Sequence, residues 1–422
     1  MNNPQKNILI LSWFFPPSTM PAAQRTYAFA KYFNRFGYRP TIVSRKWDEY
    51  QNLKDYYKPS ETQNIDYLFC RHYDAYLLPY NPKLRDRLAN KKGIINTLIR
   101  KTLSTIDILI FPLYIKISPY YPLYFFSNEL LKKSHFDAII ATGNPFELFK
   151  LAKILSKKHN IPYILDYRDD WSTSQLNFNK NITDYFKIFY FRILEKSWSS
   201  NCLFFTSVTP FYTSKINKII NRKGIVIYNG YFNFKAKLEV KDFTFIYSGK
   251  IYPQQNLNIL FEALLLFKST ISNNIKLFFI GNDDDLSIKY SIINTSLKEN
   301  IFLLKRLNSK EIHQAYCSAF GFLLFSYGEI KGILTTKIFE YLFYKKPILL
   351  CPSDNDIMQE MLIKTRTGYY ANNVKDCYNH LVFLYSKFIK MEPAIEPNLD
   401  KINQYSRKNQ IYNFSKALNE YL

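Results

Sequence analysis

The 422-residue sequence is poor in glycine, with 11 residues, and its 5 cysteines form no C-x-x-C pair. Scattered cysteines argue against a disulfide framework or a zinc site and fit a reducing compartment. The 5 histidines are equally dispersed, so the sequence contains no obvious metal-binding cluster. No G-x-G-x-x-G follows a predicted strand, which argues against a dinucleotide-dependent oxidoreductase.

Long apolar runs are also missing. The stretch 106–117 contains Pro112 and Lys116 and is too short to span a bilayer. The apolar residues 7–15 lead into Pro16-Pro17 and are typical of a first buried strand, not of a signal peptide. We therefore expect a cytoplasmic protein, either soluble or peripheral on a membrane.

What the sequence has in excess is positive charge, with a formal net charge of +23. Basic residues are densest between positions 83 and 101, and an aromatic stretch follows at 106–126. This arrangement is typical of a helix lying in an anionic membrane interface, where each cation adds about 1 kcal/mol of binding. The alternative is that the chain is simply lysine-rich and that these aromatics pack a core. The residues that we expect to face the membrane are Lys91, Lys92, Arg100 and Lys101.

Hydrophobic residues make up 47% of the chain, which is enough for two globular domains. Apolar strand patterns alternate with helical patterns, as in doubly wound α/β domains. In the first half we predict strands at 8–11, 41–44, 137–141, 162–166, 203–206 and 225–228, and helices at 25–36, 146–158 and 184–198. In the second half we predict strands at 243–247, 276–280, 302–304, 321–325 and 348–350, with a helix at 401–422.

The segment 331–349 is the most informative part of the sequence. It predicts a loop, a helix start and a turn into a buried strand. At helical spacing, Thr336, Lys337 and Glu340 cluster on one face. The amide groups at a helix start suit a diphosphate, and a carboxylate one turn later suits the hydroxyls of a ribose. A plain surface helix with a Lys337–Glu340 pair is the alternative.

This segment resembles the nucleotide-binding helix of family 4 glycosyltransferases of the GT-B fold. The family carries a second glutamate upstream of the one matched by Glu340, and that position holds Gly332 here. Gly249 and Lys250 resemble the start of the family's donor-diphosphate loop, in which Gln255 takes the place of a second cation.

In the first half, Thr142, Gly143, Asn144 and Pro145 resemble a T-G-x-P loop found in a branch of the same family. That branch also carries an R-D-x-W sequence, here residues 168–171. We predict that Asp169 takes the proton of the acceptor hydroxyl and that Arg168 orients the other carboxylate of this sequence. An Arg–Asp ion pair that only fixes the loop is the alternative. We assign Thr142, Gly143 and Asn144 of the T-G-x-P loop to the acceptor side, together with Arg25.

The resemblance implies two doubly wound Rossmann-like domains that face a central cleft. They would be an acceptor-binding domain at 1–232, with the basic and aromatic insertion at about 81–130, and a nucleotide-sugar-binding domain at 233–400. A C-terminal helix at 401–422 would return to the first domain. The Asp283–Asp285 sequence has the D-x-D form of a metal site, but we expect it to cap a helix, and we expect neither a metal nor a cofactor.

The implied function is a retaining glycosyltransferase in bacterial surface polysaccharide synthesis, such as capsule, O-antigen or exopolysaccharide. It would use a nucleotide-sugar donor and a polyprenyl-diphosphate-linked glycan acceptor on the cytoplasmic face of the anionic inner membrane. A sugar-nucleotide epimerase of the same fold is one alternative. A non-catalytic protein that binds nucleic acid or membrane is another, although no nucleic-acid-binding module is present.

Overall fold

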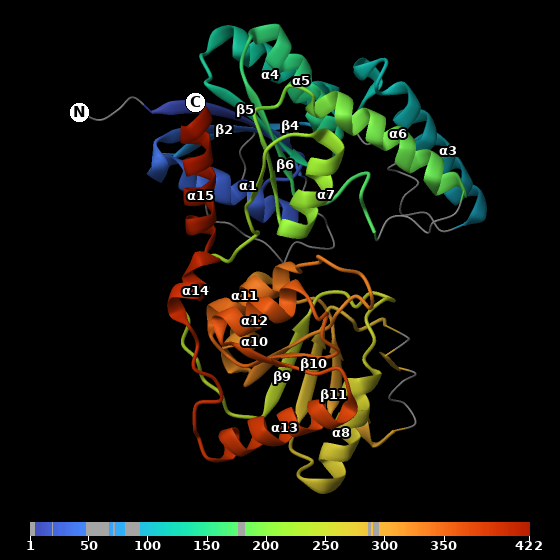
Figure 1. Cartoon of the computed structure of the whole chain (residues 1–422), viewed down its shortest axis with the longest axis vertical. Coiled ribbons are helices and arrows are strands. Elements are labelled where there is room, and N and C mark those ends of the chain that lie inside the picture. Colours follow the sequence, from blue (N-terminus) through green and yellow to red (C-terminus); the bar gives the residue numbers. More distant parts are fainter. Residues whose placement is uncertain are drawn as a thin grey trace. The chain divides into compact units, whose positions relative to one another are not determined.

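The computed structural model describes residues 5–18, 20–47, 67–70, 72–80, 93–175, 182–285, 288–289 and 295–422. The chain divides into two compact units (Figure 1). Unit 1 consists of Met1–Tyr228 together with Ile411–Leu422, and unit 2 of Asn229–Gln410. The sequence predicts boundaries at 232 and 400, whereas the structure divides the chain after Tyr228 and again inside the last helix. Lys91 and Lys92 lie outside the described residues.

Unit 1 contains an eight-stranded sheet in the order β3-β4-β2-β1-β5-β6-β7-β8, in which only the β3–β4 pair is antiparallel. The predicted strands correspond to six of its members, and the pair β3–β4 was not predicted. The strands are β1 (Lys6–Leu11), β2 (Tyr38–Arg45), β3 (Tyr67–Cys70), β4 (Tyr73–Leu78), β5 (Ala138–Gly143), β6 (Tyr163–Tyr167), β7 (Phe205–Ser207) and β8 (Gly224–Val226).

The helices of unit 1 cover a core of aliphatic and aromatic side chains. They are α1 (Pro21–Tyr32), η1 (Phe33–Phe36), α3 (Ile94–Ile110), η3 (Ile115–Ile117), α4 (Tyr121–Lys133), α5 (Glu147–His159), α6 (Ile182–Ser199), α7 (Pro210–Ile220) and α15 (Arg407–Tyr421), the last of which begins in unit 2. The part of α15 in unit 1 packs Phe414 against Phe29 and Phe33, with ring centroids 5.6 and 5.4 Å apart.

The aromatic stretch 106–126 divides between core and surface. Phe111 and Tyr120 pack in the core, where the Tyr120 ring centroid lies 4.7 Å from that of Trp13. Leu113 and Phe125 are exposed. The prediction of one continuous membrane-facing block is therefore wrong for Phe111 and Tyr120, because the tertiary fold turns these rings inward.

Unit 2 contains a six-stranded parallel sheet in the order β11-β10-β9-β12-β13-β14. Its strands are β9 (Thr244–Ser248), β10 (Lys276–Ile280), β11 (Ile301–Leu304), β12 (Gly321–Leu324), β13 (Ile348–Leu350) and β14 (Gly368–Tyr370). Its helices are α8 (Asn258–Thr270), η4 (Ser296–Glu299), α10 (Ser309–Ser318), α11 (Thr336–Tyr344), α12 (Ile357–Thr365), α13 (Val374–Ile389) and α14 (Leu399–Gln404). The predicted helix at 401–422 is thus two helices, α14 and α15, separated at Tyr405 and Ser406.

In each sheet the strand order reverses beside the first strand of the unit. In unit 1, the chain passes from β1 to β2 on one side of β1, and β5 later pairs with the other side of β1. In unit 2, β10 lies on one side of β9 and β12 on the other. Open α/β sheets bind ligands at the carboxyl ends of the strands at such a reversal. This topology directs attention to the loops that follow β1, β5 and β6 in unit 1 and β9, β10 and β12 in unit 2.

Candidate functional site

In unit 2, the turn after β9 contacts the first turn of α11. Gly249 has a φ of +94°, and a Cβ built on it would lie 2.8 Å from Cε of Lys337. Only glycine combines this left-handed backbone with room for the lysine side chain. The structure therefore brings together two residues that the sequence analysis assigned to the donor from separate motifs.

Lys337 is partly buried, and its Nζ lies 5.0 Å from the ring centroid of Tyr247. Burial lowers the pKa of Lys337 to about 8, although the negative charge of Glu340 raises it. The ammonium group is still mostly protonated at neutral pH. It is thus a poorly hydrated cation beside a glycine turn, where it would attract an anion more strongly than an exposed lysine does.

Glu340 lies one helical turn after Lys337. Its Oε2 accepts a hydrogen bond of 3.5 Å from the hydroxyl of Tyr316 on α10. Burial raises the pKa of Glu340, while the charges of Lys337 and Arg407 favour the carboxylate. Tyr316 and Arg407 were not identified from the sequence, because both are distant along the chain and neither belongs to a motif.

The start of α11 is capped by Thr335, whose Oγ1 accepts a 3.0 Å hydrogen bond from the amide of Lys337. Thr336, which we assigned to the donor, is the first residue of the helix. Just before it, Gly332 has a φ of +76°, and its amide donates a 2.6 Å hydrogen bond to Oδ2 of Asp356. This left-handed backbone explains a glycine at the position where the family pattern has a glutamate.

The side chain of Lys250, next in the β9 turn, is exposed. Gln255, which we compared with a second diphosphate cation, is 6% exposed. Its Oε1 accepts from the amide of Tyr252, and its Nε2 donates to the carbonyl of Phe325. Gln255 therefore fixes the shape of the turn, and its amide is engaged within the protein at the position where the family pattern has a second cation.

Asn282 ties the loops after β9 and β10 together. Its Nδ2 donates to the carbonyl of Gly249 at 2.8 Å, and its Oδ1 accepts from the amide of Ile251 at 3.0 Å. Nearby, Oδ1 of Asp285 accepts a hydrogen bond from the amide of Ile288, and the capping of a following helix by this sequence stays a prediction. In the part of the chain that the structure describes, no group of three or more His, Cys, Asp or Glu residues is arranged to hold a metal.

In unit 1, the T-G-x-P and R-D-x-W loops meet beyond the ends of β5 and β6. The amide of Arg168 donates a 3.1 Å hydrogen bond to the carbonyl of Gly143, and the Trp171 ring stacks on Phe146 at 4.9 Å. A Cβ on Gly143 would lie 2.7 Å from the Phe146 ring, so the close approach requires glycine. Asn144 is exposed at the tip of the loop.

The predicted catalytic pair forms an ion pair of 2.6 Å between Arg168 and Asp169. The Asp169 side chain is 52% exposed and the Arg168 side chain 16%. The next carboxylate, Asp170, is buried, and burial together with the charge of Asp169 raises its pKa to about 6. Of the two carboxylates, Asp169 is therefore the one that is open to solvent.

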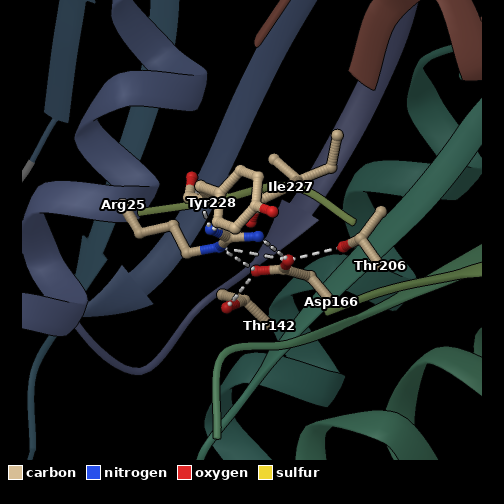
Figure 2. Close-up of polar contacts among 6 residues, drawn as sticks. All are labelled: Arg25, Thr142, Asp166, Thr206, Ile227 and Tyr228. Atoms are coloured by element: carbon tan, nitrogen blue, oxygen red, sulfur yellow. Dashed lines mark hydrogen bonds and ion pairs between the residues drawn. The ribbon is translucent and has the colours of Figure 1, made fainter. Parts of the chain in front are cut away.

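Arg25 and Thr142, which we assigned to the acceptor side, both bind the buried carboxylate of Asp166 (Figure 2). Arg25 is 2% exposed, and its Nη2 lies 2.6 Å from Oδ1 of Asp166. The guanidinium also donates to the carbonyl of Ile227, and Thr206 donates to Asp166. These contacts link α1, β5, β6, β7 and the segment after β8. Arg25 therefore acts as a structural anchor, and its burial argues against direct contact with an acceptor.

Comparison with known proteins finds a family match within unit 2 and a fold match over almost the whole chain. Residues 232–385 match the family model of glycosyl transferases group 1. No curated protein sequence matches the chain.

Solved structures resemble the fold over almost the whole length. HepE of Anabaena in complex with UDP-glucose has 11% identity and a TM-score of 0.59, covering 98% of this chain and 99% of HepE. Sucrose-phosphate synthase of Thermosynechococcus elongatus has 11% identity and a TM-score of 0.65, with 99% of both chains covered. A glycosyltransferase of Rickettsia africae has 14% identity and a TM-score of 0.59, covering 99% of this chain and 98% of its own. The predicted GT-B fold is confirmed.

Proposed function

We infer that this chain, a glycosyltransferase of the GT-B fold with a group 1 domain at residues 232–385, transfers a sugar from a nucleotide-sugar donor bound in unit 2. The observation that carries this inference is the contact between Lys337 and Gly249, with Glu340 one turn further along α11. These three residues lie inside the matched domain and at the strand-order reversal of the sheet.

We propose that the donor diphosphate lies between the β9 turn and the start of α11. The helix amides and the ammonium groups of Lys250 and Lys337 would stabilise the negative charge that develops as the diphosphate leaves. Glu340 would accept hydrogen bonds from the ribose hydroxyls. We propose that these cations make a metal unnecessary. The complex of HepE with UDP-glucose supports a UDP-sugar as the first donor to test.

On the acceptor side, we propose that Asp169 takes the proton of the attacking hydroxyl and that Arg168 holds the carboxylate in place. The acceptor would attack from the face that the diphosphate leaves, so that the anomeric configuration is retained. This stereochemistry follows from the family resemblance. The exposure of Asp169 supports the base role, because a buried carboxylate would not reach a bulky glycan.

We further propose that the acceptor is a lipid-linked glycan of a bacterial surface polysaccharide and that the protein is peripheral on the cytoplasmic face of the inner membrane. Arg100 and Lys101, from the predicted membrane block, lie on α3. Exposed Ile95 and Leu109 on this helix support contact with an apolar phase. Among the described residues, no helix combines the length and hydropathy required to cross a bilayer.

The donor site is tested by calorimetry and thermal shift with UDP, GDP, CMP and dTDP, each with and without EDTA. One nucleotide should bind, and chelation should leave its affinity unchanged. Glu340→Ala and Lys250→Ala should each weaken binding by about 10-fold or more, because each removes a charged contact to the nucleotide.

The matched controls are Glu360→Ala and Lys364→Ala, which break an exposed ion pair on α12 of the same unit and should leave nucleotide affinity unchanged. Unchanged affinity in both Glu340→Ala and Lys250→Ala would refute the donor site. The stereochemistry is tested separately by NMR of the anomeric proton of the product, and an inverted product would exclude the retaining mechanism.

A further inference from the structure

A lysine-lined cavity lies within unit 1 and is separate from the residues assigned above to donor or acceptor. It has a volume of about 530 Å³, and its walls come from α5, the C-terminal end of α6 and Pro112, two residues after the end of α3. Lys150, Lys153, Lys157 and Lys158 line it from α5, while Pro112 and Trp198 line it from the other side. The remaining lining residues are neutral, so every charge at this cavity is positive.

The spacing of these lysines places them along one face of α5. The two inner ammonium groups are held by helix ends: Lys150 donates to the carbonyls of Phe111 and Pro112, and Lys153 to the carbonyl of Ser197. The two outer lysines, Lys157 and Lys158, are exposed. Within the described residues, neither of them forms an ion pair with a carboxylate.

Keeping these charges close together has an electrostatic cost. Burial, followed by the neighbouring charge of Lys153, lowers the pKa of Lys150. Burial and the charge of Lys157 lower the pKa of Lys153 in the same way. An anion in the cavity would remove this repulsion, because it would pair with several ammonium groups at once.

An exposed apolar stripe on α6 leads to the same cavity. Tyr185, Phe186, Phe189 and Ile193 are 60%, 71%, 67% and 50% exposed. At helical spacing they share one face, which continues one turn after Ile193 to Ser197 in the cavity wall.

Exposed cations, among them Lys187, Arg192 and Lys196, lie along the same helix, which is at the periphery of unit 1 (Figure 1). A stripe of large aromatics with basic neighbours is typical of a surface that enters the membrane interface.

We propose that the cavity binds the phosphate of an anionic phospholipid head group while the aromatic stripe of α6 lies in the membrane interface. The proposal rests on the membrane attachment proposed above and names the residues that carry it. A lipid satisfies both features, since its phosphate matches the lysines and its acyl region matches the stripe. A second copy of this chain fits less well, because each copy carries a net charge of +23 and would bring further positive charge to the cavity.

The test is co-sedimentation of the full chain with vesicles of equal parts phosphatidylglycerol and phosphatidylcholine, compared with vesicles of phosphatidylcholine alone. The native chain should bind the anionic vesicles. Lys157→Gln/Lys158→Gln should weaken this binding on the order of 30-fold, through the loss of two cations at the membrane surface. Phe186→Ser/Phe189→Ser should also weaken it. Because all four side chains are exposed, the variants should fold normally.

The matched control is Lys310→Gln/Lys375→Gln, which removes two exposed lysines from helices of unit 2. Its effect should be at most about threefold, because neither lysine lines the cavity and salt screens an exposed charge that does not contact the lipid. Equal effects of the two lysine pairs would overturn the cavity as the site. Dimerisation through the α6 stripe in light scattering, lost in Phe186→Ser/Phe189→Ser, would also overturn the proposal.

Nucleotide affinity, measured in parallel, separates this proposal from the donor site. It should be unchanged in the Lys157→Gln/Lys158→Gln variant. Absence of vesicle binding by the native chain would overturn both the membrane attachment and the cavity while leaving the donor site intact. Calorimetric titration with inorganic phosphate distinguishes a free-anion site: tight phosphate binding without vesicle binding would overturn the lipid assignment.

Discussion

Replacing Arg25 by methionine is expected to destabilise unit 1 by about 3–5 kcal/mol. Asp166 is fully buried, and Arg25 donates to both of its carboxylate oxygens. Methionine retains much of the side-chain volume but leaves the carboxylate with two neutral donors, Thr142 and Thr206. A buried charge that loses its partner is strongly destabilising, because the protein interior solvates it poorly. The carbonyl of Ile227 also loses its donor.

The effect can be measured on unit 1 alone. The four tryptophans of the chain all lie in this unit, so intrinsic fluorescence follows its unfolding without interference from unit 2. They are Trp13, Trp47, Trp171 and Trp198. For a unit of this size, each kcal/mol of destabilisation lowers the midpoint temperature of unfolding by about 2–4 °C. The midpoint followed by fluorescence should therefore fall by about 6–20 °C.

The matched control is Arg35→Met, which removes an exposed arginine from the same unit and should change stability by less than about 0.5 kcal/mol. The double variant Arg25→Met/Asp166→Leu removes both charges and should recover much of the loss. If Arg25→Met and Arg35→Met unfold at the same temperature, the anchor role of Arg25 is refuted.

Two further predictions follow from local geometry. Burial raises the pKa of Glu195 from 4.5 to about 7, so the folded unit keeps a proton that the unfolded chain has lost, and the stability of unit 1 should fall as pH rises through this window. Glu195→Gln should remove most of this dependence of the unfolding free energy on pH, as measured by urea unfolding followed by fluorescence. The smaller contribution of Asp170 should remain below about pH 6. An unchanged pH dependence would contradict the burial argument. Gly332→Ala should destabilise unit 2 by about 1–2 kcal/mol, because φ at this position is +76°. In far-UV circular dichroism, unit 2 of the variant should unfold at a lower temperature than unit 2 of the native chain. The unfolding transition of unit 1, followed by tryptophan fluorescence, should not move. Equal stability of unit 2 in both chains would contradict the prediction and mean that the loop adapts.

Several elements could be predicted because their signal is local. Strands β10 and β13 form at the predicted residues, 276–280 and 348–350, since short apolar runs with β-branched or aromatic residues favour buried strands. Strand β14 was missed because Gly368, Tyr369 and Tyr370 are partly exposed and carry no such pattern. The donor motif was also visible in the sequence, since Lys337 and Glu340 lie on one helical turn.

The remaining features depend on residues that are distant in the chain. Lys346 lies in the segment 331–349, yet it is buried. Its ammonium group donates to the carbonyls of Tyr316, Cys317 and Ala319 at the end of α10. Nothing near Lys346 in the sequence indicates this contact. Gln255 likewise stands where the family motif has a second cation, and only its burial and hydrogen bonds in the folded chain show that it supports the turn.

The sequence by itself determined the alternation of strands and helices and the residues that stand at the ends of the strands, because both depend on local pattern. Only the tertiary structure decided which side chains contact one another. Arg25 meets Asp166 across 141 residues, and Lys153 on α5 meets the end of α6. It also decided which aromatic rings of 106–126 enter the core and which ones on α6 remain exposed. The physical reason is that a buried charge or ring is stabilised by whatever the fold brings against it, and the local sequence does not contain that neighbour.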